Sequence, residues 1–291
     1  MIHWRTRQKL AKGILGGVTL LFLAYQWFPM LTMAVLSFTG PEGGTTFPMR
    51  SVSLHWYREL LRVSMVDDFK PPMLRSFVLA LACSVTTAIL SLAAAQAMRA
   101  RFRGSGFFFY LLLLGIMAPG LLVGFGVAVV ARIVGIPLGW YTSTFAVHLV
   151  WTLPFGLLTM LAVFNRFDRR LEEAALTLRA SRWTAFWRIT FPLVLPGVIG
   201  AGLFGFTLSY DEFARSLFAT GSEQTLPLVI FAQFDRQLQP TLYAIGTATT
   251  AVSLATVAMF TFLFRMVRRR ARTEARHPLR ELAPQRKENR L

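Results

Sequence analysis

The chain has 291 residues, of which 54% are hydrophobic and 15% charged, and its formal net charge is +17. Soluble domains carry about a quarter of their residues as charged side chains, so this composition excludes an ordinary soluble domain and predicts a membrane protein. The basic excess does not indicate nucleic-acid binding, because 23 of the 31 Lys and Arg residues fall in residues 1–12, 99–103, 166–188 and 265–291, which alternate with apolar blocks as the positive-inside rule requires.

Six apolar stretches approach the length of about 20 residues that a membrane-spanning helix needs. They are residues 14–38, 73–98, 106–130, 141–164, 193–208 with a continuation toward 213, and 242–266. The first follows a basic N-terminus, as in a signal peptide, but it is too long for such a segment and lacks a small-residue cleavage site, so we interpret it as a retained span.

An even number of spans places both termini on one side of the membrane, and their basic residues assign that side to the cytoplasm. We therefore predict an all-α membrane protein with six transmembrane helices and N-in/C-in topology. Residues 1–13 form a cytoplasmic basic N-terminus and residues 14–266 the membrane domain. Residues 267–291 form a basic cytoplasmic tail that is predicted to be disordered.

The polar segment between the first two spans, residues 40–72, is predicted to lie outside the cell. A short amphipathic helix with Leu54, Tyr57, Leu60 and Leu61 on its apolar face fits this segment. A loop helix that caps the bundle is favoured over a binding role. In the third span, Pro119 and the neighbouring glycines predict either a bend or close helix packing.

A polar and cationic loop, residues 165–192, separates the fourth and fifth spans. Asp168 is a candidate N-cap for a first short helix, and Glu172 and Glu173 sit in its first turns, where the helix dipole favours negative charge. The apolar face of this helix consists of Leu171, Ala174, Ala175 and Leu178.

Ser181 is a candidate N-cap for a second short helix in the same loop. The face of this second helix consists of Trp183, Phe186, Trp187 and Thr190. Pro192 then marks the point where a new helix is expected to begin. The pattern predicts two short helices with a corner between them.

Tyr210, Asp211 and Glu212 lie at the far end of the fifth span. A charge at the centre of a bilayer costs about 2.5 to 3.5 kcal/mol, so the two acids are expected to face an aqueous path or the external interface. Two interpretations stay open. The acids form a cation site on the solute path, or they are the polar end of a helix, with Arg215 one turn beyond Asp211 and paired with it. Residues 224–240 are too polar and too short to span, and predict an external or re-entrant helix.

No spacing typical of metal ligands, phosphate loops or catalytic triads is present, so we expect no cofactor, no metal and no catalytic residues. His148 is the only histidine inside a span, and a packed or hydrogen-bonded core histidine is favoured over a proton relay. The single cysteine, Cys83, excludes an intrachain disulfide. The sequence therefore contains no energy source of its own.

The segment Glu173, Ala174 and Ala175, followed at fixed spacing by Ile189 and Pro192, closely resembles the EAA motif of ATP-binding-cassette importer permeases. That motif continues with Gly, Ile, Leu and Pro; here Arg179 and Phe191 replace the Gly and the Leu. The resemblance extends over nearly the whole chain, through residues 53–60, 117–124, 209–213 and 225–231. It is greatest to the second permease subunit of spermidine and putrescine transporters.

The resemblance implies a type I importer subunit whose loop docks, as a pair of coupling helices, in a groove of a separate ATPase. The residues expected to contact or support that ATPase are Glu173, Ala174, Ala175, Arg179, Trp183, Trp187, Ile189 and Pro192. A glycine at position 179 would supply left-handed backbone freedom at a helix end, so the arginine there implies either a different turn or strain. The implied partners are two ATPase copies, a second permease in a heterodimer, a periplasmic solute-binding protein and the lipid of the bacterial inner membrane.

The resemblance implies polyamine cations as the solute, with Tyr210, Asp211 and Glu212 as candidate path residues. Permeases for ferric iron, sulfate and phosphonate share much of the pattern, and Arg215 beside the acids could favour an anion, so these solutes stay open. A membrane assembly or sensor subunit that binds a cytoplasmic partner without moving solute is the alternative of another class.

Overall fold

Helices make up nearly all regular structure in the part of the chain that the computed structural model describes, namely residues 2–42, 44, 46–60, 68–100, 102–236 and 240–281. The one pairing of extended backbone within these residues is an isolated bridge between Thr39 and Val52. The prediction of an all-α fold is confirmed. The chain forms two compact units, Met1–Lys70 with Ile230–Val252, and Pro71–Val229 with Ser253–Leu291.

Five helical runs within the described residues are long and apolar enough to cross a membrane, and a bent pair of helices makes a sixth if it counts as one span. The runs are α1 (Ile2–Leu36), α3 (Lys70–Arg99), α6 (Ser143–Phe164), the continuous series α8 (Arg182–Ala185), η1 (Phe186–Thr190) and α9 (Phe191–Tyr210), and α12 (Pro240–Glu281). The bent pair is α4 (Ser105–Met117) and α5 (Gly120–Val134). The shorter helices are α2 (His55–Leu60), α7 (Arg170–Thr177), α10 (Ser216–Ala219) and α11 (Leu226–Arg236).

In the first unit, the short helix α2 packs on the end of α1. The hydroxyl groups of Tyr57 and Ser37 are hydrogen-bonded at 2.7 Å, and the Tyr57 ring lies 5.4 Å from that of Phe38. The predicted loop helix is confirmed, and these contacts fit its capping role. Leu61 of its predicted apolar face lies outside the described residues.

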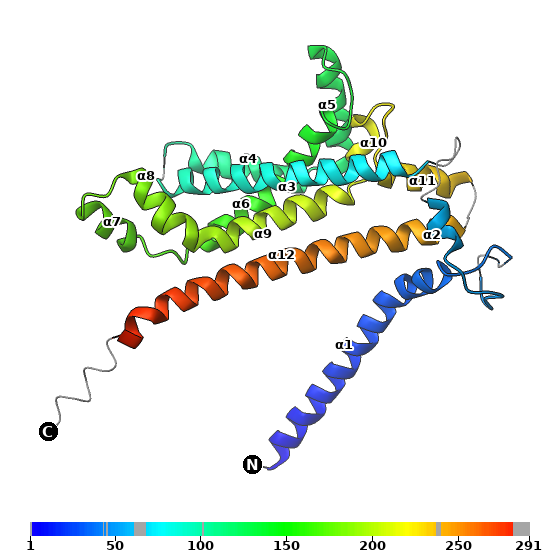
Figure 1. Cartoon of the computed structure of the whole chain (residues 1–291), viewed down its shortest axis with the longest axis horizontal. Coiled ribbons are helices and arrows are strands. Elements are labelled where there is room, and N and C mark those ends of the chain that lie inside the picture. Colours follow the sequence, from blue (N-terminus) through cyan, green and yellow to red (C-terminus); the bar gives the residue numbers. More distant parts are fainter. Residues whose placement is uncertain are drawn as a thin grey trace. The chain divides into compact units, whose positions relative to one another are not determined.

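In the second unit, α3, α6 and α9 run side by side (Figure 1). Their shared core contains Ala95, Leu157, Met160, Phe164, Val194 and Ala201. Gly205 allows α9 to approach α3 closely, because a Cβ there would lie 2.8 Å from the Cα of Ser84. The Ser84 hydroxyl donates to the carbonyl of Gly202 at 2.7 Å, so a polar contact holds the same two helices together.

The third predicted span consists of two helices, because the chain bends by 110° between α4 and α5. Ala118 is extended, as the residue before a proline usually is, and α5 starts directly after Pro119. The predicted bend is confirmed. With 13 residues, α4 is about 20 Å long, which is less than the hydrocarbon core of a bilayer.

α9 begins at Phe191 with Pro192 in its first turn, so the predicted helix start is confirmed. No break separates α9 from η1, and helical backbone runs for 29 residues from Arg182 to Tyr210. Proline has no N–H and its ring crowds the carbonyl four residues earlier, so an ordinary helical turn would be strained here. A wider turn at η1 accommodates it, and the Phe191 N–H donates to the carbonyl of Phe186, five residues back.

Two further predictions concern the C-terminal third of the chain. The short helix expected within residues 224–240 is α11, and the Ser76 hydroxyl accepts a hydrogen bond from the Leu226 N–H at 2.8 Å. The tail that was predicted to be disordered from residue 267 is helical as far as Glu281, and residues 282–291 lie outside the described part.

Candidate functional site

The corner between the two loop helices is formed by Arg179 in the left-handed region, with φ at +62°. Its N–H donates to the carbonyl of Leu176 at 3.0 Å, and the Ala180 N–H donates to that of Ala175 at 3.0 Å. These two bonds form a Schellman motif, the helix ending in which glycine is the usual left-handed residue. The loop therefore has the turn that glycine usually forms, and the backbone of Arg179 is strained because it has a positive φ.

The start of each loop helix is fixed by the predicted polar side chain. The Asp168 carboxylate accepts from the Arg170 N–H at 3.0 Å at the start of α7. The Ser181 hydroxyl accepts from the Thr184 N–H at 3.1 Å at the start of α8. The Ser181 cap is confirmed, whereas Asp168 lies one residue before the N-cap of α7, because that helix begins at Arg170 and its N-cap is Arg169.

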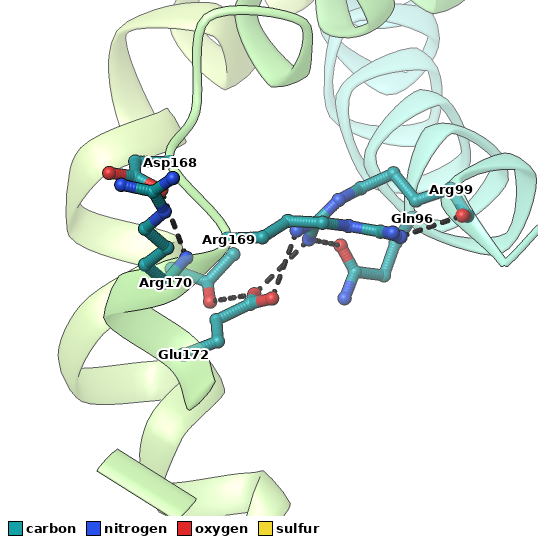
Figure 2. Close-up of polar contacts among 7 residues, drawn as sticks. Gln96, Arg99, Asp168, Arg169, Arg170 and Glu172 are labelled. Carbon is teal, nitrogen blue, oxygen red and sulfur yellow. Dashed lines mark hydrogen bonds and ion pairs between the residues drawn. The ribbon is translucent and has the colours of Figure 1, made fainter. Parts of the chain in front are cut away.

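Glu172 and Glu173 are neighbours in sequence but have different surroundings. Glu173 is exposed. Glu172 accepts two hydrogen bonds from the guanidinium of Arg99, the last residue of α3, at 3.1 Å and 2.9 Å (Figure 2). Arg99 and Glu172 are only 11% and 22% exposed, and this two-pronged geometry is the strong form of an ion pair.

Further contacts hold the two ends of this pair, and we name the set of Arg99, Arg169, Glu172 and Thr190 the Arg99–Glu172 junction. Arg169 donates to the backbone carbonyl of Arg99 at 2.7 Å, and so satisfies the end of α3. The Thr190 hydroxyl in η1 donates to Glu172. The Arg99 guanidinium also lies 4.8 Å from the ring centre of Phe164 at the end of α6. The junction therefore links α7 to three membrane-spanning helical runs.

The junction changes the acidity of Glu172. Burial raises the pKa of this carboxyl group, but the hydrogen bonds from Arg99 and Thr190 and the positive charges of Arg99 and Arg169 outweigh burial, so that the pKa lies below its ordinary value. Glu172 is therefore ionised at neutral pH.

The sequence did not predict the members of this junction as site residues. Arg99 was expected to lie in the basic segment that follows the second span, and Glu172 was indistinguishable from Glu173 on charge alone. The sequence indicated a possible ion pair only through a basic residue after one span and acids in a loop on the same side of the membrane. That signal does not say which acid reaches which base.

Several apolar side chains of the loop lie open to the surface. Leu178 is 84% exposed and Trp183 70%, and Trp187 is also exposed. We name these three residues the docking face. The rings of Trp183 and Trp187 meet edge to face at 5.4 Å, so the two indoles form one surface. Of the other predicted loop residues, Ala174, Arg179 and Pro192 are exposed, whereas Ala175 and Ile189 are half-buried.

The two acids predicted for the solute path lie just after the C-terminal end of α9 and have different surroundings. Glu212 and Arg215 are 8% and 7% exposed and form an ion pair at 3.1 Å, so the predicted partner of Arg215 is corrected from Asp211 to Glu212. Asp211 is exposed, and its carboxylate accepts a hydrogen bond from Ser253 of α12 at 3.5 Å. Tyr210 is buried and stacks on Phe206 at 5.6 Å.

A buried polar cluster fastens this end of α9 to α6. The two ring nitrogens of His148 are each 2.8 Å from a serine hydroxyl, that of Ser209 at the end of α9 and that of Ser216 at the start of α10. The guanidinium of Arg215 lies 3.7 Å from the ring centre of Trp151. The predicted role of His148 as a hydrogen-bonded core residue is confirmed. Among the described residues, no group of three His, Cys, Asp or Glu is placed to hold a metal.

The sequence and the fold are similar to those of known transport proteins. A family model for binding-protein-dependent transport system inner membrane components matches residues 87–273. The spermidine/putrescine transport system permease protein PotC of Escherichia coli is 31% identical over 83% of this chain and 90% of its own length. The putrescine transport system permease protein PotI of the same species is 27% identical over 79% and 83%. A crystal structure of a bacterial ABC transporter involved in the import of alginate has a chain with a similar fold, with a TM-score of 0.62 and 16% identity over 87% of this chain and 95% of that one.

Proposed function

The chain belongs to the family of binding-protein-dependent transport system inner membrane components, and we propose that it carries polyamine cations such as spermidine and putrescine across the membrane. It is a multi-pass subunit of the inner membrane in an ATP-driven importer, and it is not itself an enzyme. The polyamine proposal is supported by two groups of relatives whose names specify spermidine and putrescine or putrescine alone.

A complete importer also contains an ATPase, a second permease and a periplasmic binding protein. A related alginate importer has been crystallised with its ligand-bound periplasmic protein. Because each chain has one loop of the α7–α8 type, a machine with two ATPase subunits needs two such chains. The partner permease in our proposal is a sister chain rather than a second copy.

The observation that carries the proposed mechanism is the docking face. Large apolar side chains on a polar loop are costly in water, and exposed aromatic residues of this kind are typical anchors of protein interfaces. In our proposal the loop lies in the cytoplasm, and Leu178, Trp183 and Trp187 insert into a groove of the ATPase. Glu173, Ala174 and Arg179 border this face, and the half-buried Ala175 and Ile189 support it from within.

Two connections would carry movement from this face into the membrane domain. The first is the continuous helix from Arg182 to Tyr210, which is about 43 Å long and joins the docking face directly to the buried polar cluster around His148. The second is the Arg99–Glu172 junction, which links α7 to α3. Driving a two-state equilibrium from 1:99 to 99:1 takes about 5.5 kcal/mol, which ATPase closure would supply through these connections.

Asp211 is the best candidate for contact with the solute. A polyamine cation can reach this exposed carboxylate, whereas the carboxylate of Glu212 is occupied by Arg215. Tyr210 is buried, so its proposed role is to hold the neighbouring Asp211 in place rather than to contact the solute. Glu212 becomes available only in a conformation that separates it from Arg215.

Reconstitution in proteoliposomes with the ATPase, the second permease and the binding protein tests the function. Spermidine should stimulate ATP hydrolysis and accumulate inside, and sulfate and ferric iron should do neither. The Glu173→Lys variant should stay in the membrane but lose both activities. A complex that assembles and hydrolyses ATP without moving any of these solutes would point to an assembly or sensor subunit instead.

A further inference from the structure

Three exposed arginines, Arg179, Arg182 and Arg188, lie in the same short stretch as the docking face. The described structure gives none of their guanidinium groups an ion pair or a side-chain hydrogen bond within the chain. By contrast, Arg99 and Arg169 of the same region are both engaged in the Arg99–Glu172 junction.

The left-handed backbone conformation of Arg179 costs free energy that a glycine at this position would avoid. Left-handed backbone is unfavourable for a side chain with a Cβ, and glycine adopts it freely. No ion pair or hydrogen bond of the Arg179 guanidinium within the described residues offsets this cost. A strained residue that persists without internal compensation points to a benefit outside the chain.

We propose that Arg179, together with Arg182 and Arg188, forms a cationic rim around the docking face and pairs with carboxylates that line the ATPase groove. This inference rests on the proposed function and specifies the chemistry of the partner surface. An apolar groove floor would receive Leu178 and Trp183, and an acidic edge would receive the arginines. Arg179 stands at the turn between the helices, so its side chain reaches the partner wherever the corner enters the groove.

The positive-inside rule alone does not explain the position of Arg179. That rule is met by basic residues anywhere in the loop, and residues 166–188 already contain six arginines. Arg170 is exposed and lies at the other end of α7, a helix about 12 Å long. It is therefore a matched control that carries the same charge but lies outside the corner.

The test measures binding of the purified cognate ATPase to the full-length chain in nanodiscs of phosphatidylcholine, at 50 mM and 500 mM NaCl. Arg179→Gly removes the cation and suits the corner geometry, so folding is not the cause of any loss. We expect Arg179→Gly to weaken binding about five- to tenfold at 50 mM NaCl and less than about twofold at 500 mM, because salt screens charge pairs. Arg179→Lys should recover most of the affinity, and Arg170→Gln should bind like the wild type.

Two outcomes overturn the proposal. If Arg179→Gly binds like the wild type at both salt concentrations, the groove has no acidic edge. If the loss occurs only in nanodiscs that contain phosphatidylglycerol, the arginines bind the membrane surface instead. Trp183→Ala separates this inference from the proposed function. Loss of binding in Trp183→Ala with normal binding in Arg179→Gly retains the docking and rejects only the charge pairing, whereas normal binding in Trp183→Ala rejects the docking itself.

Discussion

Arg99 at the end of α3 holds Glu172 of α7 through two hydrogen bonds at 3.1 Å and 2.9 Å, although 73 residues separate them in the sequence. The side chain of Arg169, the N-cap of α7, donates a hydrogen bond to the backbone carbonyl of Arg99. Arg99 is therefore held through both its side chain and its backbone carbonyl. A displacement of α7 has to move the end of α3 or break this double connection.

The first prediction concerns the strength of that connection. Arg99→Gln and Glu172→Gln should each lower the free energy of unfolding, and the double variant should lose less than the sum, with a coupling energy of about 1–2 kcal/mol for a half-buried two-pronged pair. Chemical unfolding in detergent measures it. Glu173→Gln is the matched control, and it should change stability by less than about 0.5 kcal/mol because Glu173 is exposed. Strict additivity of the two substitutions would show that the pair does not contribute.

The second prediction is a pH dependence. The pKa of Glu172 is lowered from 4.5 in the folded protein, so the contribution of this carboxylate is complete above that value and is lost as pH falls through the folded-state pKa. The wild type should therefore be more stable than Glu172→Gln at pH 7, and the difference should shrink once the pH falls below about 4.5. Thermal unfolding of both proteins between pH 7 and pH 3 measures this. A difference that stays constant over that range would contradict the ionic origin of the contact.

The third prediction concerns the corner of the loop. Arg179→Val should destabilise α7 by about 1–2 kcal/mol, because a β-branched residue is poorly suited to positive φ. Arg179→Gly should protect the amides of α7 from hydrogen exchange at least as well as the wild type does. Hydrogen exchange followed by mass spectrometry reports both effects on the same peptide. Equal protection in the valine and glycine variants would mean that residue 179 does not hold the left-handed conformation.

Much of this loop was predictable from local rules. The cap at Ser181, the corner between the helices and the exposed tryptophans follow from side-chain chemistry within a few residues, and the sequence contains that information. The motif also identified position 179 as the turn. The motif did not show which backbone conformation Arg179 adopts, because the energetic cost of a left-handed arginine is weighed against the contacts of the whole loop.

The errors arose where distant parts of the chain decide the outcome. The helix start at Pro192 was predicted, but the sequence did not show that the wide turn of η1 joins α8 to α9 without a break. Arg215 could reach either acid by its spacing, and in the structure it pairs with the buried Glu212 and lies over the ring of Trp151. The choice of Glu172 over Glu173 by Arg99 likewise depends on how α7 lies against α3.

The fourth prediction separates the two acids at the end of α9. Asp211→Asn should reduce spermidine uptake while leaving the protein stable, because Asp211 is exposed. Glu212→Gln should instead destabilise the protein by about 3–5 kcal/mol, because it leaves the buried Arg215 without its charge partner. Radiolabelled uptake and thermal unfolding of both variants measure the contrast. Unchanged uptake by Asp211→Asn would remove Asp211 from the solute path.

The fifth prediction uses two glycines of α5. A Cβ at Gly124 would collide with the backbone carbonyl oxygen of Arg215, whereas one at Gly126 meets nothing within 4 Å. Gly124→Ala should therefore destabilise the protein by about 1–3 kcal/mol and displace the segment that carries the Glu212–Arg215 pair. Gly126→Ala should be neutral or slightly stabilising, since alanine favours a helix. Similar melting temperatures for the two variants would contradict the close approach of α5 and Arg215.

The central claim is that the docking face binds the ATPase, and cysteine crosslinking tests it most directly. The native Cys83 is fully buried, so a cysteine introduced at the exposed Leu178 is the reactive thiol in the membrane-embedded chain. In proteoliposomes that contain the complete importer, a short bifunctional reagent should join Leu178→Cys to the ATPase with a yield that changes between the ATP-bound and nucleotide-free states. Absence of a crosslink in every nucleotide state, in a complex that still transports spermidine, would contradict the account.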